Sequence, residues 1–140
     1  MDHHINICLY HGSVNNSLLD NDWVSRGNKD DIGIFDGFDF AFLGDIHKHQ
    51  FLTPKIAYPG SLRQNNYGED IVKGYILWDI KSKKDFKSEF VVLDQKRYFF
   101  TLNINDKKDI GTIPLPENCR IRVRINKQIS IKDEQEIRQK

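Results

Sequence analysis

The stretch from Phe38 to His47 reads Phe-Asp-Phe-Ala-Phe-Leu-Gly-Asp-Ile-His. Its first six residues are mostly apolar and predict a strand, which ends where Gly44 lets the backbone turn sharply. Residues two apart in an extended segment project to the same side, so Asp45 and His47 can direct a carboxylate and an imidazole into one small volume. Those donors suit manganese, magnesium, iron or zinc. A solvated turn is the alternative interpretation of so short a pattern.

A second histidine ends another apolar run. Residues 5–10 predict a buried strand, which His11 and Gly12 follow. If the two strands are parallel neighbours, His11 emerges from the same sheet edge as Asp45 and His47. The alternative is that His11 only terminates its strand and bonds a backbone carbonyl. Three further histidines are predicted to lie outside any site: His3, His4 and His49.

The loop that begins at Tyr58 carries an aromatic ring, a hydroxyl at Ser61 and a guanidinium at Arg63. Such groups can bond phosphates and offer a face for stacking. An ordinary polar connection is an equally good explanation of the composition.

The remaining segments predict a strand-rich protein. Residues 17–26 predict a short helix or an ordered loop, and Ser130 is a plausible N-cap for a short final helix. Strands are predicted at 56–58, 74–80, 89–93, 98–104 and 120–126, with 74–104 as a meander or the edge of a mixed sheet.

Composition excludes several classes of protein. The 140 residues are 39% hydrophobic and 29% charged, which is typical of a globular chain with one domain, or a domain piece plus a small module. Cys8 and Cys119 form neither a disulfide framework nor zinc-ligand spacing. Neither a signal peptide nor a membrane span is present, so we expect a cytoplasmic protein, or its nuclear or viral equivalent, that is not secreted.

Four motifs in this order resemble the second half of SbcD-type DNA repair exonucleases. These enzymes are relatives of the meiotic recombination eleven nuclease in the calcineurin-like metallophosphoesterase superfamily. The resemblance covers roughly residues 5–80 and continues more loosely after Tyr98. The motifs are LYHGSV at 9–14, FDFAFLGDIHK at 38–48, AYPGSLRQ at 57–64 and GYILWDI at 74–80.

The resemblance implies an α/β fold. Residues 1–95 would be the C-terminal half of a strand-rich metallophosphoesterase β-sandwich flanked by helices. Residues 96–140 would be the start of a small α+β capping domain that binds DNA. Both ends of the chain then look truncated, and we expect an exposed apolar sheet edge where the missing half would pack.

The resemblance also implies metal-dependent hydrolysis of DNA phosphodiesters, as an exonuclease or endonuclease of double-strand-break repair. Two divalent ions would serve it, Mn²⁺ or alternatively Mg²⁺, with His11 and Asp45 binding one ion and His47 the other. Asp45 stands where the family more commonly has histidine, which puts the metal preference in doubt. The family's N-terminal metal motifs are not in this sequence. The site is therefore incomplete in this chain, and a two-metal mechanism needs both ions.

The resemblance implies DNA as a partner, contacted by Tyr58, Ser61 and Arg63. The other partners implied are an SMC-like ATPase of the SbcC or Rad-fifty type, the missing N-terminal half and, as an open possibility, a second copy of the chain. Two alternatives remain: another calcineurin-like phosphoesterase, and a catalytically inert DNA-binding remnant. Three arginines alternate along the predicted strand at 120–126, where a solvated face is favoured over DNA contact: Arg120, Arg122 and Arg124.

Overall fold

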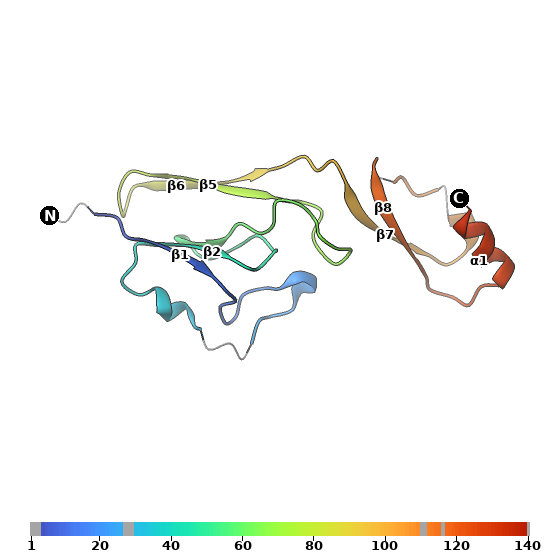
Figure 1. Cartoon of the computed structure of the whole chain (residues 1–140), viewed down its shortest axis with the longest axis horizontal. Helices are drawn as coiled ribbons and strands as arrows, with labels where there is room; N and C mark the ends of the chain where they lie inside the picture. Colours follow the sequence, from blue (N-terminus) through green and yellow to red (C-terminus); the bar gives the residue numbers. More distant parts are fainter. Residues whose placement is uncertain (1–3, 27–29, 110–111, 116, 140) are drawn as a thin grey trace. The chain divides into compact units, whose positions relative to one another are not determined.

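The computed structural model (Figure 1) describes residues 4–26, 30–109, 112–115 and 117–139. The chain divides into two compact units, the first of Met1–Gln64 with Gly68–Gln95 and the second of Asn65–Tyr67 with Lys96–Lys140. Small sheets dominate both, and α1 is the one α-helix among the described residues. The general prediction of a strand-rich α/β protein is confirmed. No described helix combines the length and apolar character that crossing a membrane requires.

A four-stranded sheet organises the first unit, with strands in the order β1-β2-β4-β3. Strands β1 (Ile7–His11), β2 (Phe40–Gly44) and β4 (Ile56–Tyr58) are parallel, and β3 (Gln50–Thr53) pairs antiparallel with β4. The sequence did not predict β3, which is short and has polar residues at both ends. Because β1, β2 and β4 are parallel, their carboxyl ends lie at one edge of the sheet.

One face of this sheet carries an aliphatic and aromatic core. It includes Val14, Leu43 and Tyr58, each at most 2% exposed. Two short 3-10 turns contribute to this side, η1 (Asp20–Asp22) and η2 (Ile32–Phe35). The predicted helix at 17–26 is therefore an ordered loop with one turn of 3-10 helix, which was the alternative that the sequence left open.

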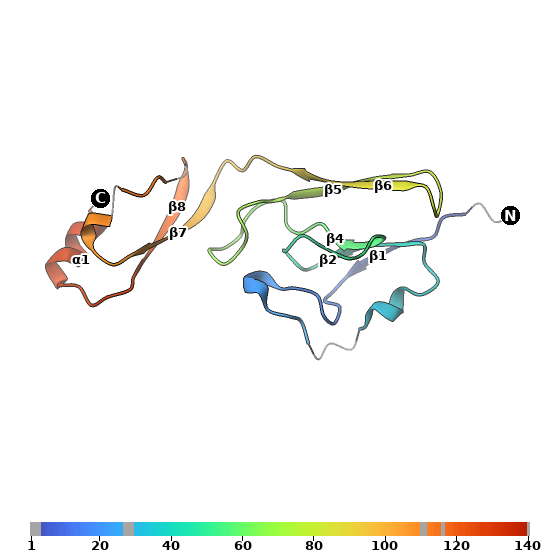
Figure 2. The same ribbon diagram turned by 180° about the vertical axis from the view of Figure 1, so that it is seen from behind.

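The opposite face packs against an antiparallel hairpin of β5 (Gly74–Ile80) and β6 (Phe86–Val92). Trp78 stacks on Phe42 with ring centroids 5.0 Å apart, and Phe86 meets Phe40 edge-on at 5.1 Å. Figures 1 and 2 show this hairpin and the 3-10 turns on opposite sides of the sheet. Aromatic packing thus joins two layers of strands, and β6 begins three residues before the predicted start.

Strand β1 is one of the two edges of the sheet, β3 being the other, and it pairs with β2 alone among the described strands. Leu9 is 79% exposed and Ile7 is 43% exposed on this strand. An unpaired strand that exposes aliphatic side chains is a template for association with another chain. The apolar edge expected from the sequence is present.

The second unit pairs β7 (Tyr98–Ile104) with β8 (Cys119–Ile125) in parallel, and also contains η3 (Lys107–Asp109) and α1 (Ile131–Arg138). The predicted meander over 74–104 is wrong in its last strand. Its apolar residues align with those of β8, so β7 pairs there and not with the β5–β6 hairpin. The predicted N-cap is confirmed, because the Ser130 hydroxyl accepts a 3.1 Å bond from the Asp133 amide.

Candidate metal centre

The first two predicted ligands emerge side by side. Strands β1 and β2 run in register, with His11 opposite Gly44, and the Gly12 amide donates to the Gly44 carbonyl at 3.3 Å. Asp45 follows directly. A methyl group on Gly44 would lie 3.1 Å from Cδ2 of His11, so the imidazole lies against this glycine. The structure therefore brings His11 and Asp45 to one edge of the sheet, as parallel pairing predicts.

Asp45 leaves β2 in an uncommon conformation. Its φ is +93°, a region that residues other than glycine rarely adopt. The exposed carboxylate accepts a 3.1 Å hydrogen bond from the Ser13 hydroxyl, which comes from the turn after β1. This bond links the two strand ends through side chains. Strained backbone of this kind is concentrated at functional sites.

Tyr58 fixes the turn that follows His11. Its side chain is fully buried, its hydroxyl donates to the Gly12 carbonyl at 2.7 Å and it accepts from the Val14 amide at 3.1 Å. Burial also raises the pKa of this phenol. The prediction that Tyr58 contacts DNA is wrong, because neither its ring nor its hydroxyl is accessible to a ligand. The sequence could not show this, since the partners lie more than forty residues away.

His47 is held by a carboxylate that sequence reasoning did not assign to the site. Its Nδ1 lies 3.1 Å from Oε1 of Glu69, and the imidazole side chain is 43% exposed while that of Glu69 is fully buried. Lys73 Nζ lies 2.9 Å from Glu69 Oε2 and also donates to the His47 carbonyl at 2.9 Å. Opposite charges four residues apart were the only sequence signal for this pair, and they do not point to His47.

Acidic groups also surround His47. Ligand atoms of Asp20, His47 and Glu69 all lie within 4.8 Å of one another, the one such cluster among the described residues. Burial, followed by the charge of Glu69, raises the pKa of Asp20. His11 and Asp45 are not members of this cluster. The structure thus places His47 among acidic side chains and does not gather the three predicted ligands into a single compact group.

The loop after Tyr58 lies beside His47. The Ser61 amide donates to the His47 carbonyl at 3.2 Å, and the Ser61 hydroxyl donates to the Arg63 carbonyl at 2.9 Å. That hydroxyl is also 3.3 Å from Glu69 Oε2. Arg63 itself is exposed. The structure therefore positions Ser61 beside His47, and the contact of Ser61 and Arg63 with DNA stays a prediction.

His11, Asp45 and His47 carry donor atoms that suit divalent ions, but they are too few for two ions. Two imidazoles and a carboxylate are donors that manganese accepts, and His11 and Asp45 are exposed at the sheet edge. Glu69 Oε2 is already paired with the buried ammonium of Lys73. Three donors cannot complete two coordination spheres. A two-metal site built on these three donors alone is therefore incomplete.

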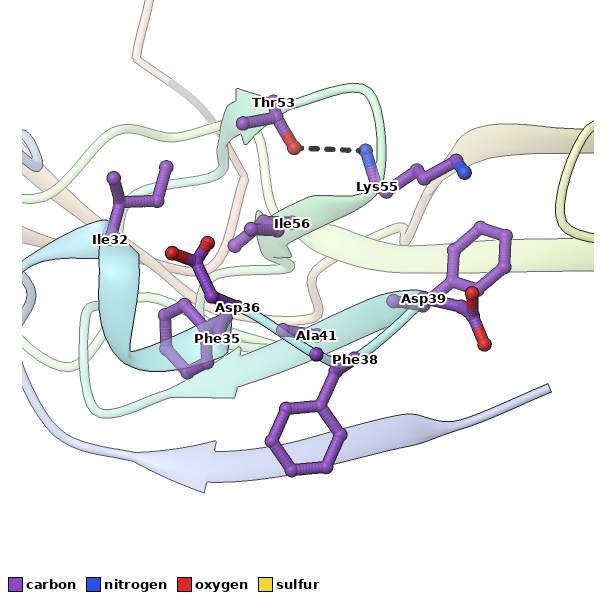
Figure 3. Close-up of a pocket in the computed structure, with 11 residues that line it drawn as sticks. Ile32, Phe35, Asp36, Phe38, Asp39, Ala41, Thr53, Lys55 and Ile56 are labelled. Carbon is purple, nitrogen blue, oxygen red and sulfur yellow. Dashed lines mark hydrogen bonds between the residues drawn. The ribbon is translucent and has the colours of Figure 1, made fainter.

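A pocket lies elsewhere, beside the start of β2 (Figure 3). Apolar side chains such as Phe35, Phe38 and Ile56 line it together with Asp36 and Asp39. It includes the amino end of β2, whereas the predicted ligands follow the carboxyl end. It contains none of the predicted site residues, and nothing in it points to a particular ligand.

Comparison with known proteins relates the chain to a viral protein. No protein-family model matches the chain. The chain is 33% identical over 119 residues to an uncharacterized protein of Acanthamoeba polyphaga mimivirus. The alignment covers 83% of this chain but only 8% of the viral protein, so the chain spans a small part of its relative. The similarity therefore extends across most of this sequence and carries no activity with it.

Proposed function

We propose that this chain is the C-terminal part of a metal-dependent DNA nuclease of the SbcD type. Residues 1–95 would belong to its metallophosphoesterase domain and residues 96–140 to its capping domain. The observation that carries the proposal is the parallel pairing of β1 and β2 in register, which presents His11 and Asp45 from adjacent strand ends. The histidine that follows Asp45 by two residues, His47, supplies the third donor.

The chain's own residues would hold and orient the metal ions. His11 and Asp45 would bind one ion, and His47 would contribute to the other. When bound, divalent ions supply Lewis acidity and an activated water for phosphodiester hydrolysis. Ser13 keeps the Asp45 carboxylate in place, and Tyr58 keeps the turn after His11 in place. Mn²⁺ is the ion that we expect, with Mg²⁺ as the alternative.

The substrate in this proposal is DNA. Ser61 and Arg63 remain the candidates for phosphate contact, since their loop bonds the backbone of His47 and Arg63 is exposed. Tyr58 is no longer among them. Arg122 packs its guanidinium 4.8 Å from the centre of the Tyr67 ring, which favours a structural role for this arginine.

The missing ligands would come from an N-terminal nuclease segment. The exposed aliphatic edge at Ile7 and Leu9 supports this part of the proposal, because a further strand could pair there. The similarity to a segment of a far longer viral protein agrees with a role inside a larger polypeptide. An SMC-like ATPase of the SbcC or Rad-fifty type and a second copy of the chain are the other proposed partners.

Reconstitution tests the proposal. The chain is assayed for Mn²⁺-dependent cleavage of linear double-stranded DNA, alone and after mixing with the N-terminal half of an SbcD-type enzyme. His47→Ala is the test variant and exposed His4→Ala is the control. Cleavage in the mixture that His47→Ala abolishes and His4→Ala preserves supports the proposal. Association of the halves without cleavage contradicts it and favours an inert DNA-binding remnant.

A further inference from the structure

A buried polar network in the first unit centres on Glu69. This carboxylate is fully buried, yet it contacts the partly exposed ring of His47 on one side and the ammonium of Lys73 on the other. Lys73 is itself only 3% exposed. A buried carboxylate with a cation at 2.9 Å is held ionised, since isolated burial would otherwise favour its neutral form. Glu69 therefore acts as a hydrogen-bond acceptor.

We infer that Glu69 is a positioning residue that fixes His47 in the tautomer with the proton on Nδ1. An ionised carboxylate can only accept hydrogen bonds, so the nitrogen 3.1 Å from Oε1 must donate. In a neutral imidazole the other nitrogen, Nε2, then carries the lone pair. This inference rests on the proposed function in one respect: Nε2 of His47 is the atom that would bind a metal ion.

Lys73 orients the carboxylate for this role. Its ammonium contacts Oε2 of Glu69 and also donates to the carbonyl of His47, so it joins the acceptor to the backbone that carries the ring. The Ser61 amide donates to the same carbonyl. Side chain and backbone of His47 are thereby restrained by one network. Partners that orient a metal-ligating histidine through its second nitrogen are a general feature of metal sites.

A single isosteric substitution can reverse the tautomer. In Glu69→Gln the introduced amide has one oxygen and one NH₂ group. An ammonium is a donor with no acceptor, so the amide must turn its oxygen toward Lys73. Its NH₂ group then faces His47 and donates to Nδ1, which must now accept. The proton of the imidazole moves to Nε2, and the atom proposed to bind metal loses its lone pair.

Two-bond ¹H–¹⁵N spectra of the full chain, without metal or DNA, test the inference. They are recorded at about pH 8.5, roughly two units above the ordinary histidine pKa. Wild type, Glu69→Gln and the control Asp70→Asn are compared, with urea-unfolded chain as the reference. Asp70 is an exposed carboxylate next in sequence that pairs with Lys48 at 3.0 Å, so its substitution makes the same change of charge.

We expect the Nδ1-protonated form at His47 in wild type and in Asp70→Asn, and the Nε2-protonated form in Glu69→Gln. A purely structural role for Glu69 would leave the tautomer unchanged, and that result overturns the inference. An Nε2-protonated His47 in wild type also overturns the inference. This measurement tests it even if Glu69→Gln does not fold. Since no metal or cleavage is measured, a failure here is distinct from a failure of the proposed nuclease.

Discussion

His11 and Gly44 lie opposite each other at the ends of two parallel strands, and the imidazole of His11 lies against the glycine. Because β1 ends at His11 and β2 ends just before Asp45, this pairing brings the two side chains to the same edge of the sheet. It also depends on a small residue at position 44. The hydroxyl of Tyr58 bonds the backbone of the turn that follows His11 and holds it in place.

Removal of that hydroxyl is expected to destabilise the protein. Tyr58→Phe leaves the Gly12 carbonyl and the Val14 amide without their buried partner, at a cost of about 1–3 kcal/mol in the free energy of unfolding. Urea denaturation measures the loss. Tyr75→Phe, at a side chain 40% exposed, is the control and should change stability by less than about 0.5 kcal/mol. Equal effects in the two variants would contradict the assigned role of Tyr58.

Two glycines with positive φ offer a matched comparison. Gly60 has φ +81°, and a methyl group there would lie 2.8 Å from the His47 carbonyl oxygen and 2.9 Å from the His49 amide nitrogen. Gly37 has φ +96° and open space. Gly37→Ala should cost only the conformational term of about 1–2 kcal/mol. Gly60→Ala should cost clearly more, because backbone atoms block the methyl group, and it should shift the His47 resonances.

Thermal or urea denaturation measures both glycine variants under one set of conditions. If Gly60→Ala is no more destabilising than Gly37→Ala, the loop does not pack against His47 as described.

The ion pair between Glu69 and Lys73 predicts that removing one charge destabilises the protein more than removing both. Lys73→Met leaves a buried carboxylate uncompensated and should cost about 3–5 kcal/mol. Adding Glu69→Gln to that variant should recover much of the loss, because no buried charge then remains. Lys48 is the control: it pairs with the exposed carboxylates of Asp22 and Asp70, so Lys48→Met should cost at most about 1 kcal/mol. Additive effects in the double variant would show that Glu69 and Lys73 do not interact.

Tyr10 predicts a pH dependence at the alkaline end. Its hydroxyl donates to Asp30 at 2.5 Å, and this hydrogen bond, helped by desolvation, raises the pKa of the phenol to about 12. The folded chain therefore holds this proton more tightly than the unfolded chain does. The contribution to stability is complete below the unfolded pKa of about 10 and is lost as pH rises through 12.

Ultraviolet titration of the phenolate checks this prediction. Asp30→Asn should return the pKa of Tyr10 toward the ordinary value while the other tyrosines titrate unchanged. An unaltered titration curve in Asp30→Asn would contradict the assignment.

The sequence predicted those elements that a local pattern determines. Strands β4, β5 and β7 have the predicted bounds, and the N-cap at Ser130 is correct, because apolar runs and capping residues act over a few positions. Strand β3 was missed, since four residues with a polar residue at either end give little periodic signal. The partner of β7 was misassigned because strand pairing depends on contacts between distant segments.

The candidate site was accessible to sequence reasoning only in part. His11 and Asp45 follow apolar runs, so strand ends predicted their position. The role of Glu69 was not visible, because it lies 22 residues from His47 and looks like any loop carboxylate. Tyr58 was misread for the same reason: its hydrogen-bond partners lie more than forty residues away, and only the three-dimensional structure shows that the ring is buried.

The central claim is that the ends of β1 and β2 bind divalent ions, one through His11 and Asp45 and the other with the help of His47. Paramagnetic broadening of histidine ring signals by added Mn²⁺ tests it most directly, because it detects weak binding to the chain alone. His4 in the same molecule reports non-specific effects. Low Mn²⁺ concentrations are expected to broaden the rings of His11 and His47 well before that of His4. Equal broadening of the three rings, or none at His11 and His47, would contradict the claim.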